Sequence, residues 1–155
     1  LQQSSAASDV YKRQEDDREA IIEGIADGTI DAIASDHIAV DGDAKAQPFG
    51  PAQPGASGID TLLALTLSLV HRERISMLRA MECLSLAPAS ILDIDGGALI
   101  EGAAADLVLF DPSASWVVRA ADFASNSRIT PFEGLPVQGR VRSSWVGGMP
   151  VFTRS

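Results

Sequence analysis

The sequence is poor in several features that mark large classes of protein. It contains one cysteine, so no disulfide can form within the chain, and two histidines among 155 residues. Its 12 lysines and arginines form no cluster and are outnumbered by 21 acidic residues, whereas nucleic acids and anionic membranes bind concentrated positive charge. No apolar run approaches the roughly 20 residues that cross a bilayer. We therefore expect a soluble chain of a reducing cytoplasm, with neither a nucleic acid nor a membrane as its partner.

The apolar content is high enough for a folded core. Hydrophobic residues make up 46% of the chain, which argues against wholesale disorder. The opening stretch LQQSSAASDVYKRQ has no helical or strand period and no signal-peptide layout. We expect residues 1–14 to be a non-native leader joined to a reading frame that starts near Glu15. A natural disordered tail is the alternative.

A helix and a strand are predicted directly after this leader. The stretch EDDREAIIEGIADG places Ile21, Ile22 and Ile25 at helical spacing behind an acidic first turn, and Gly28 is suited to end the helix. The following TIDAIASD alternates as a short buried strand of a parallel sheet does. The sequence therefore predicts an α/β unit with its strand at residues 29–36.

A long loop leads from this strand to further helices. Residues 38–58 are rich in Pro, Gly, Ala and Asp without a usable period, and loops of such length inside a compact domain are usually functional. The stretches IDTLLALTLSLVHR and ISMLRAMECLSL predict two apolar helices, the second with Cys83 buried. Pro88 fits the first turn of another short helix, and Gly96 and Gly97 are expected to end the helical region.

The pattern changes to short β-rich segments near residue 98. Three segments have strand patterns: 105–111, 115–118 and 139–152. The last predicts a hairpin with Gly147 and Gly148 at its turn. We therefore divide the chain into an α/β part, residues 15–96, and a β part, residues 97–155.

The end of the predicted strand is the candidate functional site. Asp36 and His37 follow the last alternating residue, and in (β/α)8 barrels the catalytic residues lie at the C-terminal ends of the strands. The structural alternative is that Asp36 caps the following loop by accepting backbone N–H groups. Both interpretations are open from the spacing of the residues alone.

Six segments, in this order, resemble the C-terminal part of a dihydroorotase of the amidohydrolase superfamily. They are DGTIDAIASDH, KAQPFGPAQPGASGIDTLLAL, LSLAPASILDI, GGALIEGAAADLVLFDP, SRITPFEG and VGGMPVF. The resemblance covers residues 15–155. It implies an α/β fold in which residues 15–96 are the last strand and helices of a metal-dependent (β/α)8 hydrolase barrel. Residues 97–155 would then be part of a small β-sandwich domain.

The resemblance also implies a chemistry and a set of site residues. Dihydroorotases use zinc to interconvert carbamoyl-aspartate and dihydroorotate in de novo pyrimidine biosynthesis. Asp36 corresponds to the family's last metal ligand, and such a carboxylate also carries a proton between nucleophile and leaving nitrogen. Backbone groups of Pro54 and Gly55 correspond to positions that contact the substrate ring, although turn formation explains these residues equally well. His37 is either a residue that orients the metal site or a packed surface histidine.

Two residues depart from the family pattern, and several metal ligands are missing. Val40 stands where many dihydroorotases have a substrate-binding histidine, and Ile129 where an asparagine is common. The two histidines, far apart, cannot assemble a zinc centre with Asp36. We therefore expect a fragment that is catalytically silent by itself.

Three functional hypotheses follow from the resemblance. The first is a piece of a dihydroorotase whose activity belongs to the complete protein. The second is a related cyclic-amide hydrolase such as an allantoinase or dihydropyrimidinase. The third is a non-catalytic dihydroorotase-like subunit that scaffolds aspartate transcarbamoylase. A homodimer is the other partner that the resemblance suggests.

Overall fold

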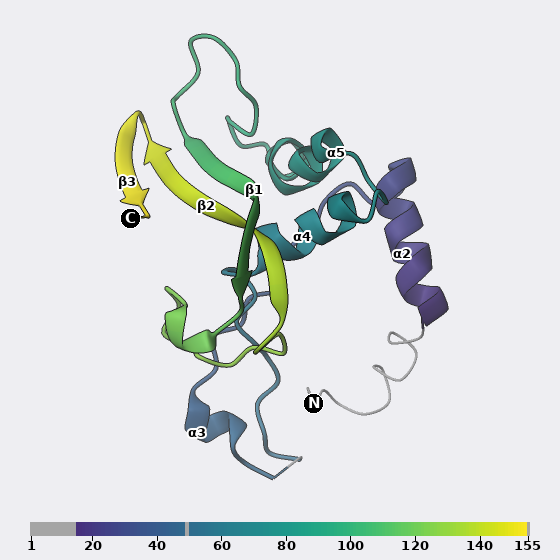
Figure 1. Cartoon of the computed structure of the whole chain (residues 1–155), viewed down its shortest axis with the longest axis vertical. Coiled ribbons are helices and arrows are strands. Elements are labelled where there is room, and N and C mark those ends of the chain that lie inside the picture. Colours follow the sequence, from purple (N-terminus) through teal and green to yellow (C-terminus); the bar gives the residue numbers. More distant parts are fainter. Residues whose placement is uncertain (1–14, 49, 155) are drawn as a thin grey trace.

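The computed structural model describes residues 15–48 and 50–154. Its helices and strands are, in chain order, α2 (Glu15–Asp27), α3 (Gly42–Lys45), α4 (Leu62–His71), α5 (Met77–Met81), the π-helix η2 (Glu82–Leu86), α6 (Ala87–Ile91), β1 (Leu107–Val117), the 3₁₀ helix η3 (Ala120–Asp122), β2 (Pro136–Val146) and β3 (Met149–Thr153). Figure 1 shows α4 between α2 and the sheet, with the loop that contains α3 projecting away from the other helices. None of the helices in this part of the chain is long and apolar enough to span a membrane.

Helix α2 follows the predicted pattern with one exception. Its first turn carries three acidic residues and it ends before Gly28, which has a φ of 91°. A residue with a side chain would be strained there, so the glycine suits the end of the helix. Of the three isoleucines at helical spacing, Ile22 and Ile25 are buried, whereas 51% of Ile21 is exposed.

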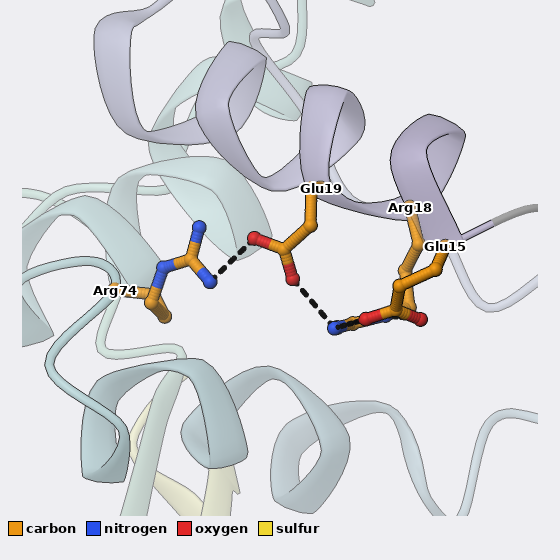
Figure 2. Close-up of polar contacts among 4 residues, drawn as sticks. All are labelled: Glu15, Arg18, Glu19 and Arg74. Carbon is orange, nitrogen blue, oxygen red and sulfur yellow. Dashed lines mark hydrogen bonds and ion pairs between the residues drawn. The ribbon is translucent and has the colours of Figure 1, made fainter.

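Charged side chains fasten α2 to the turn after α4. Arg74 Nη1 lies 2.6 Å from Glu19 Oε2, and the other oxygen of Glu19 lies 2.6 Å from Arg18 Nη2 (Figure 2). Arg18 also pairs with Glu15, and this hydrogen bond lowers the pKa of the Glu15 carboxyl. These groups are solvent-exposed in part, so we assign them an orienting role and little stability.

The predicted strand at residues 29–36, for which we keep the name extended segment, is neither a helix nor a strand and belongs to no sheet in the described part of the chain. Its backbone bonds go to helices instead: Ile30 donates to the Gly24 carbonyl at 2.8 Å, and Ile33 to the Cys83 carbonyl at 3.0 Å. The strand assignment was wrong for this segment because a strand needs a hydrogen-bonded neighbour, which local alternation cannot supply.

The second helical stretch forms a core beneath this extended segment. Ser76 caps it by accepting a hydrogen bond from the Arg79 N–H at 3.1 Å. Four buried residues form the core: Ile25, Ile75, Ala80 and Cys83. Pro88 lies in the first turn of α6 as predicted, but the helix ends at Ile91, ahead of the glycines that were expected to end it.

The β part forms one antiparallel sheet in the order β1-β2-β3. The predicted segments 105–111 and 115–118 belong to a single strand, β1, whose register shifts between Asp111 and Ser115. The predicted hairpin is confirmed, and Gly147 and Gly148 at its turn have positive φ angles of 54° and 78°. Every residue of β3 is exposed, so the second layer of a β-sandwich is not present in the described residues.

A glycine allows the sheet to approach α4. A Cβ atom at Gly139 in β2 would lie 2.3 Å from Leu67 Cδ1, and Leu67 is fully buried in α4. A side chain at this position would force Leu67 to move, and the φ of 102° at Gly139 favours glycine as well. The helical part and the sheet therefore meet along α4 and β2.

Candidate functional site

Asp36 lies exposed at the end of the extended segment, in a conformation that is uncommon for a residue with a side chain. Its φ is 46°, and non-glycine residues in this region carry strain of about 1 to 3 kcal/mol. Its carboxylate accepts no hydrogen bond from the described residues, and the helix cap that follows is made by Asp41, whose Oδ1 accepts from the Asp43 N–H at 2.8 Å. The carboxylate is thus available for another partner.

His37, the residue after Asp36, joins two distant parts of the chain. Its Nδ1 accepts a hydrogen bond from the Gly58 N–H at 3.2 Å, and its Nε2 lies 3.5 Å from Ser125 Oγ. Because a backbone N–H can only donate, Nδ1 is the unprotonated nitrogen and Nε2 carries the hydrogen. Both ring nitrogens face protein groups, so His37 holds the entrance of α4 against the segment before β2.

Two buried serines, Ser57 and Ser127, form what we call the serine clamp. Ser127 Oγ donates to the Val40 carbonyl at 2.9 Å and accepts from the Val40 N–H at 3.3 Å. Ser57 Oγ donates to the Ser127 carbonyl at 2.7 Å, and its N–H donates to the Ile129 carbonyl at 2.7 Å. Val40 lies near the start of the loop and Ser57 near its end, so the clamp holds both ends of the loop on one short segment.

The interior of the loop is closed by Lys45 and Gly55. Lys45 Nζ donates to the carbonyls of Gly55 at 2.9 Å and Gln53 at 3.2 Å. Gly55 has a φ of 131°, and a Cβ there would lie 2.7 Å from Val40 Cγ2. Glycine is therefore required by the packing, as the structural alternative for this residue predicted. Pro54 beside it is exposed.

The structure explains the valine that departs from the family pattern. Val40 is 5% exposed, and its side chain fills the space beneath Gly55. It is a packing residue of the loop and does not face solvent beside Asp36. Ile129, the second departure, contributes its backbone carbonyl to the serine clamp.

A mostly apolar cavity of about 270 Å³ lies between the extended segment and α4. Its lining includes Ile33 and Ser35 of the extended segment, Gly58 and Leu65 from the start of the α4 region, and Phe132. Gly58 brings the two walls together, since a Cβ there would lie 2.4 Å from the Ser35 carbonyl oxygen. The cavity thus ends one residue before Asp36.

The residues described here do not fit a metal site by themselves. No group of three histidine, cysteine, aspartate or glutamate side chains converges among residues 15–48 and 50–154, whereas protein zinc sites use three or four ligands. His71 is exposed in the last turn of α4. Burial raises the pKa of the Cys83 thiol, which keeps this side chain neutral inside the core.

The serine clamp is the part of the site that sequence reasoning missed. Ser57 is fully buried and Ser127 is 5% exposed, yet serine in a Gly- and Pro-rich stretch is typical of a solvated turn. The contact joins positions 70 residues apart. Nothing in either local sequence indicates that the two serines meet.

Comparison with known proteins places the chain in a family. Residues 8–151 match the amidohydrolase family, and the chain belongs to it. Among curated relatives, the dihydroorotase of Anaplasma phagocytophilum is 38% identical over 140 residues and that of Geotalea daltonii is 42% identical over 142. The alignments cover 90% and 92% of this chain but 31% and 33% of the relatives, so the chain spans about a third of their length. The family match begins inside the segment that the sequence predicts to be a leader.

Solved structures agree with this family. The L-hydantoinase (dihydropyrimidinase) from Arthrobacter aurescens superposes with a TM-score of 0.84 at 29% identity, over 92% of this chain and 33% of that one. A D-hydantoinase (dihydropyrimidinase) from Thermus sp. gives 0.83 at 24% identity, over 91% of this chain and 32% of that one, which shows the fold alone. The prediction of a dihydroorotase-like amidohydrolase with a partial α/β fold is confirmed. The β-sandwich and the division of the chain into residues 15–96 and 97–155 stay predictions.

Proposed function

We propose that the complete protein is a zinc-dependent dihydroorotase that interconverts carbamoyl-aspartate and dihydroorotate, and that this stretch contributes Asp36 to its site. The observation that carries the proposal is the exposed carboxylate of Asp36, which accepts no hydrogen bond from residues 15–48 and 50–154. The chain is also 37–42% identical to several curated proteins named dihydroorotase, which supports the choice of substrate. A cytoplasmic location and a role in pyrimidine biosynthesis, which the resemblance implies, are part of the same proposal.

In this proposal Asp36 handles a proton. Opening or closing a cyclic amide requires a group that takes a proton from the nucleophile and returns it to the nitrogen. An exposed carboxylate without a protein partner can do this, whereas a capping carboxylate is already engaged. Because the described residues do not supply a metal's other ligands, we propose that residues 15–155 do not turn over substrate alone.

The loop is proposed to form the substrate side of the site. Backbone groups at Pro54 and Gly55 are proposed to contact the dihydropyrimidine ring. Lys45 and the serine clamp fix the loop, and a fixed loop loses little conformational entropy when it binds a ligand. His37 is proposed to support the site by orientation, because its two nitrogens hold Gly58 and Ser125 beside Asp36.

Two alternatives are weaker but testable. A hydantoinase or dihydropyrimidinase is suggested by the names of the solved neighbours, although their identities of 23–29% lie below those of the dihydroorotases. A non-catalytic scaffold of aspartate transcarbamoylase is suggested by Val40, which replaces a substrate-binding histidine of the family pattern. The burial of Val40 under Gly55 gives this residue a packing role that is equally compatible with an active enzyme. A homodimer stays a prediction.

A chimera separates these hypotheses. Residues 15–155 would replace the aligned third of the Geotalea daltonii dihydroorotase, and purified protein would be assayed with dihydroorotate, dihydrouracil and hydantoin. We expect ring opening of dihydroorotate, and Asp36→Asn should lower kcat by about 10² to 10⁴. Asp41→Asn is the matched control, because it changes a nearby carboxylate that caps α3.

Each other outcome favours a different hypothesis. Turnover of hydantoin or dihydrouracil without dihydroorotate would favour the related hydrolase. A folded chimera that binds zinc but turns over none of the three would favour the scaffold. Activity of the Asp36→Asn chimera within about tenfold of its parent would contradict the role of Asp36.

A further inference from the structure

The second helical stretch contains an unusual turn. Between α5 and α6 the backbone forms the π-helix η2, and the Ala87 N–H donates to the Glu82 carbonyl five residues earlier. Single π-turns inside helices are rare and occur often at functional sites. Such a turn leaves one carbonyl without its usual helical donor. The group that donates a hydrogen bond to this carbonyl instead shows what the turn does.

Pro88 explains why the free carbonyl is that of Cys83. In an α-helix the Cys83 carbonyl would accept from the Ala87 N–H, but that donor is bonded to Glu82. In a π-helix it would accept from residue 88, which is proline and has no N–H. The Cys83 carbonyl instead accepts the Ile33 N–H at 3.0 Å.

This bond is the central attachment of the segment that presents Asp36. Ile30 is attached to Gly24 at 2.8 Å and Ile38 to Ala56 at 3.1 Å. Between those two positions, the Ile33 bond is the single backbone–backbone hydrogen bond that the described residues make with this segment. The Ile33 side chain packs on the same core that buries Cys83. Asp36 follows three residues later.

We propose that Pro88 is a positioning residue of the site. By removing one N–H from the helix, it leaves the Cys83 carbonyl to hold Ile33, and this fixes the backbone that carries Asp36. The hydrogen-bond assignment stands by itself, and its consequence for catalysis rests on the proposed function of Asp36.

The test is Pro88→Ala in the full chain, read by amide hydrogen exchange with residue resolution. The substituted alanine supplies an N–H that competes for the Cys83 carbonyl, so we expect the Ile33 amide to exchange about two- to tenfold faster. Amides of α6 should exchange at the same rate or more slowly, because alanine favours a helix more than proline does. Pro112→Ala, in β1 of the sheet, is the matched control and should leave Ile33 unchanged.

Faster exchange at Ile33 together with unchanged or slower exchange in α6 would distinguish a positioning role of Pro88 from a general structural role. If Pro88 served only the stability of the helix, exchange would change throughout α5 and α6 and Ile33 would not stand out. Unchanged Ile33 exchange in a folded Pro88→Ala variant would overturn the proposal.

A second measurement covers the case in which the variant does not fold. In the unchanged protein, NMR should detect scalar coupling across the hydrogen bond between the Ile33 nitrogen and the Cys83 carbonyl carbon. Absence of that coupling, with couplings visible in the β1–β2 pairs, would also overturn the proposal. An inactive chimera would contradict the proposed function and leave both NMR results as they are, so the two failures are distinguishable.

Discussion

The loop of residues 38–58 and the extended segment of residues 29–36 are neighbours in the sequence but differ in how many hydrogen bonds hold them. The loop has the composition of a mobile connection, yet both its ends are held by the serine clamp and its interior by Lys45. The segment has the apolar alternation of a buried strand, yet few backbone bonds hold it. The difference teaches that the loop is organised by contacts within this chain, whereas a strand-like segment depends on neighbours beside it.

The largest expected effect comes from crowding the loop. In Gly55→Ala the new Cβ would lie 2.7 Å from Val40 Cγ2 at a φ of 131°. We expect the free energy of unfolding in urea to fall by about 2 to 3 kcal/mol. Gly42→Ala, where a Cβ would meet open space, should change it by less than about 0.5 kcal/mol. Equal effects of the two variants would show that the loop is not closely packed.

Removing the serine clamp should have the next largest effect. Ser127→Ala leaves the buried backbone N–H and carbonyl of Val40 without their partner, and such losses cost about 1 to 3 kcal/mol. Urea unfolding measures the change, and hydrogen exchange should show that the Val40 amide is the most affected. Ser113→Ala, at an exposed position of β1, is the control. If Ser127→Ala behaved as this control does, the contrast between loop and segment would fail.

The smallest effect concerns Cys83, the thiol beneath the extended segment. If that segment opens locally, a thiol reagent should label Cys83 faster than the whole chain unfolds, with a weak dependence on urea. Burial raises the thiol's pKa above its ordinary value of 9.0. The unfolded thiol therefore ionises first, and stability should fall as the pH rises above that value. Labelling that follows global unfolding at every urea concentration would mean that the segment is as firmly held as the loop.

Local signals predicted the elements that local chemistry determines. Helix α4 and the hairpin turn at Gly147 and Gly148 are confirmed. Both depend on residues that are close in sequence: the helix on its apolar period, and the turn on two glycines that adopt positive φ angles. The burial of Cys83 is confirmed for the same reason. The predicted end of the helical region at Gly96 and Gly97 was wrong, since a helix can end before it reaches a residue that cannot continue it.

The features that the sequence did not predict depend on contacts between residues far apart in the chain. The strand at residues 29–36 was predicted from alternation, but pairing requires another strand. The sequence shows that Pro88 has no N–H, but only the structure shows that Ile33 lies near Cys83 and bonds the carbonyl left free at the π-turn. In the candidate site, the assignment of Asp36 and the loop stays a prediction, whereas the hydrogen bonds of His37 with Gly58 and Ser125 could be found only from the folded arrangement.

The contact between Leu67 and Gly139 has a consequence for how such chains are inherited and recombined. A relative's sheet that carries a side chain at the position of Gly139 would force the buried Leu67 side chain of α4 to move. Two relatives could exchange α4 together with β2, but an exchange of either element alone would meet a steric conflict wherever the sheet has a side chain in place of this glycine. Helix and sheet are therefore expected to change jointly during evolution, even though the chain between them offers a convenient place to join unrelated sequences.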